Sequence, residues 1–232
     1  MATNYNKGLL WEKEDTKIFL NPNDRRSYSG SGTALTNMAN GGDFTIENGA
    51  TITDNYFNFD GTNDFLNGPA TNAIIGDNNV NYTLGCWLKF TTGGGYIFNI
   101  KRSTSASTLF SLQNTSSANK IGLLFRTQND VSHTWMNSTS NYNDGNWHYL
   151  VGVADTGSVK LYINGSLEST NTSDNGVQST SGNTGSVAVG AFGGAGNEPF
   201  NGSIAYPTLY NRSLTADEIS KNYFAMRGRF GV

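Results

Sequence analysis

The 232-residue sequence has little that could cross-link it or bind a transition metal. Its single cysteine, Cys86, excludes an internal disulfide and any multi-cysteine zinc site. The two histidines, His133 and His148, are too few for a histidine-rich metal centre. A chain of this length buries about 70% of the surface that its unfolded form exposes, so one domain needs no disulfide for stability.

Charged residues are also scarce. They make up 14% of the sequence, and the formal net charge is −3. Nucleic-acid binding needs a basic face, and the sequence shows none, so we expect no nucleic-acid partner. No apolar run approaches the roughly 18 residues that span a bilayer, which predicts no membrane insertion. The first residues, Met1–Lys7, lack the basic-then-apolar order of a Sec signal, so we expect no Sec export.

Polar uncharged residues take the place of charge. Asn, Gly, Thr and Ser together make up 106 of the 232 residues. A disordered chain shares this bias but is poor in aromatic residues, whereas 12% of this chain is Phe, Trp or Tyr. Many turn-forming residues, few charges and many aromatics are typical of an all-β protein with a polar surface.

Residues 82–90 give the clearest strand signal. Period-two alternation places the apolar side chains on one face and Trp87 on the other. The apolar face consists of Tyr82, Leu84, Cys86, Leu88 and Phe90. This strand is therefore expected to be covered on both of its sides.

Turn signals connect further strands in the second half of the chain. Residues 147–154 and 158–163 flank a glycine-containing turn and predict a hairpin. Asn164-Gly165 then predicts a second tight turn, of the type that needs positive φ. Residues 169–185 are almost wholly small and polar, which predicts an exposed loop.

Two other segments carry less regular strand signals. Residues 44–47 and 51–53 alternate around Asn48-Gly49 and predict a short hairpin. Pro207 lies within the strand predicted at 200–210, which favours an edge strand or a bulge at that point.

One helix is predicted near the end, at about residues 215–227. Thr215-Ala216-Asp217-Glu218 forms a capping box, in which the threonine hydroxyl and the glutamate carboxylate satisfy free amides. Apolar residues recur at helical spacing from Ile219 to Met226, and Gly228 is expected to end the helix.

A family resemblance is carried by five stretches, residues 57–65, 82–87, 145–151, 159–165 and 200–204. In this order they resemble laminin-G-like domains of the concanavalin A-like lectin/glucanase superfamily. The resemblance implies an all-β fold, a two-sheet antiparallel jelly-roll sandwich with a short C-terminal helix. We therefore expect a laminin-G-like domain over residues 41–232, preceded by an N-terminal arm over residues 1–40.

The ends of the sequence carry a narrower resemblance. Residues 24–33, 211–219 and 222–231 resemble structural proteins of marine tailed phages (cyanophage-like) that carry this domain. This implies a virion-surface location, as a capsid decoration or a tail or fibre component made in the host cytoplasm. The implied partners are other virion proteins of the capsid or tail, and host-surface polysaccharide. Whether the chain forms a homo-oligomer is left open.

The N-terminal arm contains an apolar run that exceeds what the sandwich needs. Leu9, Leu10 and Trp11 form this run, and charged residues follow it directly. We expect these three residues to dock on the same domain or on a partner.

Calcium is left open, and no cofactor is expected to be required. Where related domains bind calcium, carboxylates and carbonyls at the sandwich edge supply the oxygen ligands. Asp60 and Asp64 are the candidates here, although Asp60 can equally stabilise its own turn. The late strand departs from the family pattern, because Ile204 is followed by Ala205 and Tyr206 where related domains often carry acids.

Enzymatic activity is not expected. Glycoside hydrolases need two carboxylates about 5–9.5 Å apart, and the related ones carry them in a Glu-x-Asp-x-x-Glu pattern. Glu12 and Glu14 have the first spacing, but no third acid stands in register. A serine–histidine–aspartate relay through His148 lacks a Gly-x-Ser-x-Gly elbow, and Cys86 lies on an apolar strand face.

Glycan binding has two candidate residues, Trp135 and Tyr142, in the polar segment 129–146. A sugar ring stacks on an exposed aromatic ring, although Trp135 could also be a half-buried strand residue. We favour a non-enzymatic virion structural protein whose lectin-like jelly roll mediates adhesion to host-surface glycans. A free carbohydrate-binding module is the alternative, and a glycoside hydrolase is less favoured.

Overall fold

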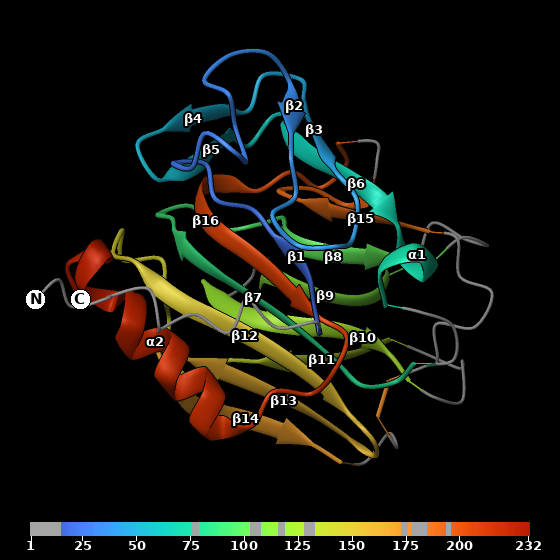
Figure 1. Ribbon diagram of the computed structural model, residues 1–232. Helices are drawn as coiled ribbons and strands as arrows, with labels where there is room; N and C mark the ends of the chain where they lie inside the picture. Colours follow the sequence, from blue (N-terminus) through green and yellow to red (C-terminus); the bar gives the residue numbers. More distant parts are fainter. Residues whose placement is uncertain are drawn as a thin grey trace, which may run out of the picture.

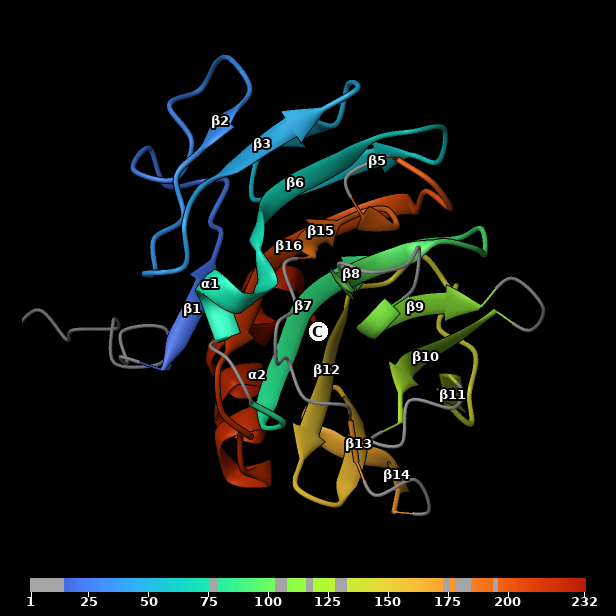
Figure 2. The same ribbon diagram turned by 90° about the vertical axis from the view of Figure 1, so that its right-hand side faces the viewer.

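The computed structural model describes residues 15–75, 79–102, 108–115, 119–127, 133–172, 176–177, 185–193 and 196–232. The described chain folds as two eight-stranded sheets stacked face to face, with one long helix outside them (Figures 1 and 2). All the strand pairs described are antiparallel. The prediction of an all-β jelly-roll sandwich with a C-terminal helix is confirmed.

Sheet A contains β1 (Thr16–Phe19), β4 (Thr51–Thr53), β5 (Tyr56–Asp60), β7 (Tyr82–Lys89), β12 (His148–Asp155), β13 (Ser158–Ile163), β14 (Ser166–Asn171) and β16 (Asn201–Tyr210). Its strand order is β14–β13–β12–β7–β16–β5–β4, with β1 paired to the last part of β16. The strand β7 therefore lies in the interior of the sheet.

Sheet B contains β2 (Ala34–Leu35), β3 (Phe44–Glu47), β6 (Phe65–Ala70), β8 (Tyr96–Lys101), β9 (Thr108–Thr115), β10 (Lys120–Arg126), β11 (His133–Asn137) and β15 (Ser186–Val189). Its order is β11–β10–β9–β8–β15–β6–β3–β2. A short helix, α1 (Thr71–Ile75), follows β6, and α2 (Ala216–Phe230) follows β16. Among the described residues, no helix is both long and apolar enough to cross a membrane.

The strand β7 is covered on both sides, as its alternation predicts. The five residues of its apolar face all lie in the core between the two sheets. Trp87 points the other way, into a second apolar cluster beneath α2. Figure 2 shows α2 on the side of sheet A that faces away from β9, β10 and β11 of sheet B.

The hairpins of the second half are confirmed. The strands β12 and β13 pair from Leu150↔Ile163 to Asp155↔Ser158. Asn164 and Gly165 both have positive φ, 51° and 79°, which is the backbone that a tight turn between twisted strands requires. The strand β14 follows directly and runs to Asn171, so it includes the start of the predicted 169–185 loop.

The hairpin predicted around Asn48-Gly49 is wrong. The strand β3 pairs with β2 and β6 in sheet B, whereas β4 pairs with β5 in sheet A. The turn therefore carries the chain from one sheet to the other. Phe44 of β3 and Phe57 of β5 consequently enter the same core from opposite sides.

Pro207 marks a bulge, and β16 is not an edge strand at that point. The pairing of β16 with β7 skips from Ala205 to Thr208. Tyr206 has a φ of 50°, which places this tyrosine in the left-handed region. The carbonyl of Pro207 still accepts a hydrogen bond, from the amide of Leu20 at 3.2 Å.

The helix α2 begins as predicted and ends later. The Thr215 hydroxyl accepts from the Glu218 amide, and the Glu218 carboxylate accepts from the Thr215 amide. The helix passes through Gly228 and ends at Gly231, whose φ of 73° suits a C-cap. Phe230 explains the extra turn, because its ring stacks on Trp87 with centroids 4.2 Å apart.

The N-terminal segment is described from Asp15 onward. Residues 15–40 contribute β1 to sheet A and β2 to sheet B. Arg212 joins Asp15 to Glu218 of α2, at nitrogen–oxygen distances of 2.9 and 2.7 Å. Leu9, Leu10 and Trp11 lie outside the described residues, so the predicted docking role stays a prediction.

Candidate functional site

Trp135 lies on β11, the last strand of sheet B, and its side chain is 52% exposed. The pairing register sets it opposite Leu124 of β10, which is buried and supports the indole from the neighbouring strand. His133 and Asn137 flank it on the same face of β11. Trp135 thus offers an aromatic ring on the outer face of sheet B, beside polar groups.

The strands next to Trp135 continue as a polar row. Leu124 pairs with Ser111 of β9, and Ser111 pairs with Asn99 of β8. The Gln113 amide donates to the Ser111 hydroxyl at 2.8 Å, and the Asn99 amide donates to the Thr108 hydroxyl at 3.1 Å. The Oδ1 atom of Asn99 is buried without a hydrogen-bond partner. The side chains of Asn99, Thr108, Ser111 and Gln113 are themselves buried. The surface beside the indole is therefore formed by the neighbouring residues of β11, the half-buried His133 and the exposed Asn137.

Tyr142 has a different environment from Trp135. Its half-buried ring packs against the core between the sheets and meets His148 edge to face, with centroids 4.9 Å apart. Burial, with a further contribution from the charge of Glu168, raises the pKa of the Tyr142 hydroxyl. Tyr142 therefore contributes to packing at the sandwich rim, and whether it contacts a ligand stays a prediction.

Both ring nitrogens of His148 are engaged. The Asn164 amide oxygen accepts from the Tyr149 amide at 2.9 Å, so its Nδ2 donates to His148 Nδ1 at 3.1 Å. The proton of the neutral ring then lies on Nε2, which donates to Asp144 Oδ1 at 3.0 Å. This arrangement fixes the loop before β12 and leaves neither nitrogen available to deprotonate a nucleophile.

The carboxylate of Asp144 is held in its charged form. Partial burial acts to raise its pKa, but hydrogen bonds from the Asn146 side chain and amide, and from His148, outweigh it. Together these groups bring the pKa of Asp144 to about 2.

Asp60 and Asp64 come together in the turn between β5 and β6. The Asp60 amide donates to Asp64 Oδ2 at 3.2 Å, and Asp60 Oδ1 accepts from the Thr62 amide at 2.7 Å. Burial raises the pKa of Asp64. Within the described part of the chain, no three His, Cys, Asp or Glu side chains gather closely enough to hold a metal ion. A calcium ion here would need further oxygens from backbone or water, because it takes six to eight.

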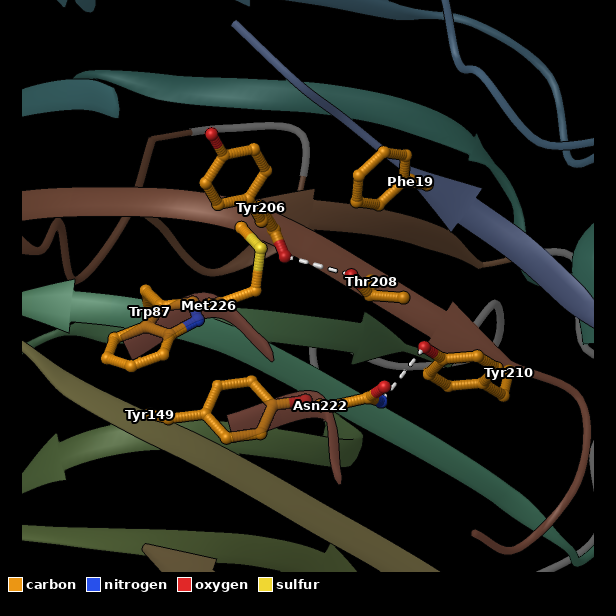
Figure 3. A pocket seen from close by; sticks show the side chains of 8 residues that line it. All are labelled: Phe19, Trp87, Tyr149, Tyr206, Thr208, Tyr210, Asn222 and Met226. Carbon is orange, nitrogen blue, oxygen red and sulfur yellow. Dashed lines mark hydrogen bonds between the residues drawn. The ribbon is translucent and has the colours of Figure 1, made fainter. Parts of the chain in front are cut away.

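A small cavity lies between α2 and the outer face of sheet A (Figure 3). Its lining is largely aromatic and consists of Phe19, Trp87, Tyr149, Tyr206, Thr208, Tyr210, Asn222 and Met226. Its volume is about 20 Å³, which suffices for one water molecule and excludes a sugar ring.

Asn222 gives this cavity its polar character. Its Nδ2 donates to the Tyr210 hydroxyl at 3.5 Å, whereas its buried Oδ1 has no partner (Figure 3). Turning the amide over would exchange the two atoms and leave the nitrogen unpaired instead. One bound water would satisfy the amide in either orientation. We therefore assign this cavity to the packing of α2. Two features of the sequence signal this layer, the alternation at Trp87 and the helical spacing of apolar residues from Ile219 to Met226.

The Asp144 network predicts an acid-dependent loss of stability. Because the folded-state pKa lies below the unfolded value of 3.8, the charged carboxylate stabilises the fold above about pH 4. This contribution is lost as the pH falls toward 2. We expect Asp144→Asn to have a lower Tm than the wild type at pH 7, with a difference that vanishes near pH 2.

Asp217→Asn is the matched control, because Asp217 is exposed in the first turn of α2. Thermal unfolding followed by circular dichroism from pH 2 to pH 7 measures both variants. A Tm difference for Asp144→Asn that stays constant across this range would contradict the assignment.

Calcium at Asp60 and Asp64 stays a prediction with a direct test. We expect the protein to fold without calcium, so EDTA should leave its Tm unchanged. A rise in Tm with millimolar calcium that Asp64→Asn abolishes would instead show a calcium site at this turn.

Comparison with known proteins connects this geometry to a family. A family model of the laminin G type, described as the concanavalin A-like lectin/glucanases superfamily, matches residues 60–220. No curated protein matches the chain.

Solved structures with the same fold come from proteins of different kinds. The Trypanosoma rangeli sialidase in complex with the inhibitor DANA aligns with a TM-score of 0.66 at 14% identity, over 89% of this chain and 32% of the sialidase. The receptor binding domain of botulinum neurotoxin C/D mosaic serotype aligns with a TM-score of 0.66 at 16% identity, over 91% of this chain and 51% of that chain. The binding domain of Paraclostridial Mosquitocidal Protein 1 aligns with a TM-score of 0.68 at 10% identity, over 90% of this chain and 52% of that chain.

These alignments establish the fold, because the identities are low. The chain spans about a third to a half of the structures that it matches. The family match covers more than half of this chain and agrees with the two-sheet sandwich. The chain belongs to the concanavalin A-like lectin/glucanase superfamily, as a domain of the laminin G type.

Proposed function

We propose that this domain is a non-catalytic glycan-binding module that serves adhesion on the surface of a phage particle. The observation that carries the glycan-binding part is the exposed indole of Trp135 on the outer face of sheet B. A sugar ring stacks its C–H face on such an indole, and its hydroxyl groups bond to amides and hydroxyls nearby. His133 and Asn137 are the polar side chains placed beside the ring.

The proposed absence of catalysis is supported by the hydrogen bonds of His148 and Asp144 and by the burial of Cys86. His148 has both nitrogens engaged, and Asp144 is fixed by Asn146 and His148. Burial raises the pKa of the Cys86 thiol, which opposes formation of a nucleophilic thiolate. A glycoside hydrolase is the less favoured alternative, because no third acid stands in register with Glu12 and Glu14. These two glutamates lie outside the described residues.

The virion part of the proposal is supported by sequence resemblance and composition. Residues 24–33, 211–219 and 222–231 resemble tailed-phage structural proteins. A surface rich in Asn, Ser and Thr keeps a projecting domain hydrated without charge. Capsid or tail proteins are the proposed partners, and Leu9, Leu10 and Trp11 are the proposed docking residues. A free carbohydrate-binding module is the alternative.

Removing the indole should weaken glycan binding without unfolding the domain. We expect Trp135→Ala to bind a glycan selected on an array about tenfold more weakly, which corresponds to about 1.4 kcal/mol. Trp135→Phe should keep part of the affinity, because a smaller ring still stacks. Tyr142→Phe tests whether the Tyr142 hydroxyl contacts the glycan directly.

Phe224→Ala is the matched control, since Phe224 is an aromatic residue on α2 that is also exposed. Equal loss of affinity in Trp135→Ala and Phe224→Ala would contradict the proposed site. The Tm of each variant checks that the fold persists.

The virion part makes a separate prediction. Mass spectrometry of purified phage particles should detect the chain at a fixed ratio to the major capsid or tail proteins. Its absence from the particles, with the free protein present in the lysate, would favour the free lectin-like module.

A further inference from the structure

A lysine on the outer face of sheet A lies between two aromatic rings. The Lys89 ammonium is 5.4 Å from the centroid of the Tyr56 ring and 5.2 Å from that of the Trp147 ring. The two rings meet at a steep angle of 60°, with centroids 5.3 Å apart. All three side chains are half-buried. Lys89 lies at the end of β7, two residues after Trp87 and on the same face.

Among the described residues, the Lys89 ammonium contacts two aromatic rings but forms no ion pair. Contact with aromatic faces is worth about 0.5–2 kcal/mol and does not use the hydrogen-bonding capacity of the three N–H groups. The ion pairs found in the described part of the chain involve other residues, such as Lys160 with Asp155. Among those residues, no carboxylate pairs with Lys89. A partly desolvated cation without a counter-charge favours an anion from outside.

Polar side chains continue the row from Lys89 across the sheet, with Ser203 buried and Asn58 half-buried. The pairing register sets Lys89 beside Ser203 of β16, and Ser203 beside Asn58 of β5. The Ser203 hydroxyl donates to Asn58 Oδ1 at 2.9 Å, and Asn58 Nδ2 donates to the Thr53 hydroxyl at 3.0 Å. Trp147 lies on the other side of Lys89, in line with the β7–β12 register. From Trp147 to Asn58 this row crosses three strand spacings, or about 14 Å.

The end of α2 borders this row. The ring of Phe230 lies 4.7 Å from that of Trp147, measured between centroids. Arg229, in the last turn of the helix, adds a second cation and donates to the Tyr206 hydroxyl at 3.4 Å. Figure 1 shows the C-terminal end of α2 on the same side of sheet A as the end of β7 and the start of β12. The row is therefore bounded by aromatic rings at its Trp147 end, whereas the exposed carboxylate of Asp60 lies beyond Asn58 at the other end.

We infer that the row Trp147–Lys89–Ser203–Asn58 binds an acidic saccharide. The Lys89 ammonium pairs with a carboxylate or sulfate group of the sugar. The Asn58 side chain, which the buried Ser203 hydroxyl orients, bonds to its hydroxyls, and Tyr56 and Trp147 contact the carbon face of the ring. An acidic peptide would also pair with the cation, so poly-glutamate is included in the test as the competing ligand. This site lies on sheet A, does not depend on Trp135, and goes beyond the proposed function.

Polysaccharides of different charge provide the test, and two of them, dextran and dextran sulfate, share the same backbone. Dextran sulfate carries sulfate esters, a polyuronate carries carboxylates, and dextran carries no charge. Isothermal titration with the full chain should give binding of at least one acidic polymer and none of dextran. Because a charge pair is screened by ions, the affinity should fall as salt is raised.

Single substitutions test whether the acidic polymer binds at Lys89. We expect Lys89→Ala to weaken binding of the acidic polymer at least tenfold, and Lys89→Arg to keep most of it. Ser203→Ala should weaken it severalfold. Lys221→Ala is the matched control, because Lys221 is an exposed lysine in the middle of α2. The Tm of each variant is measured alongside. Lys89→Ala loses the contacts with the Tyr56 and Trp147 rings, so binding is compared at a temperature well below the Tm of every variant.

Three outcomes would overturn the inference. The first is that no acidic polymer binds the wild type. The second is equal weakening by Lys89→Ala and Lys221→Ala, which would mean unspecific charge attraction. The third is equal binding of poly-glutamate and the acidic polysaccharides. Trp135→Ala should leave binding of the acidic polymer unchanged, so failure of this site and failure of the Trp135 site can be distinguished.

Discussion

The central strands β7 and β12 of sheet A are buried on both faces, by the core between the sheets and by the layer beneath α2. Trp87 is the central residue of the outer layer, because Tyr149 of β12 and Phe230 of α2 both pack on its ring. Met226 and Ile219 of α2 are fully buried in the same layer. Each such side chain stabilises the fold by about 1.5–3 kcal/mol. With α2 in place, much of the outer face of sheet A is unavailable to a ligand. Trp135 on sheet B and the Lys89 row beyond the end of α2 are the surfaces we assign to binding.

Because charged residues are scarce, neutral amide side chains form hydrogen bonds that join separate segments of the chain. Amide side chains satisfy backbone groups that ladder bonds leave free: Asn37 accepts from the Phe19 amide and donates to the Lys17 carbonyl, at 2.9 and 2.7 Å. Asn164 does the same for Tyr149 at a turn with positive φ. A chain rich in asparagine can therefore support sharp turns and irregular joints without ion pairs. The same neutral amides and hydroxyls on the surface are suited to sugar hydroxyls.

The sequence predicts those parts of the structure in which local pattern and tertiary packing agree. The alternation of residues 82–90, the turn at Asn164-Gly165 and the capping box at Thr215 all correspond to the observed elements. The turn at Asn48-Gly49 was misassigned because a local turn signal does not specify whether its strands share one sheet.

The candidate site was less predictable than the fold. The end of α2 depends on the stacking of Phe230 with Trp87, a contact between residues far apart in sequence. Trp135 and Tyr142 have similar polar surroundings in the sequence. In the structure, Trp135 is exposed on the edge strand β11, whereas Tyr142 is half-buried against His148. Lys89 had no signal of its own, since Tyr56 and Trp147 come from two other parts of the chain.

Hydrogen exchange followed by mass spectrometry tests the central claim, that α2 covers the outer face of sheet A and that the proposed glycan site lies at Trp135 on β11 of sheet B. The free protein is compared with the same protein saturated with a neutral glycan that it retains. The account predicts that β7 and β12 exchange slowly in both states, and that the glycan slows exchange in β10 and β11. Slower exchange confined to α2 and β7 on glycan binding would contradict it, because the ligand would then occupy the face that the helix covers.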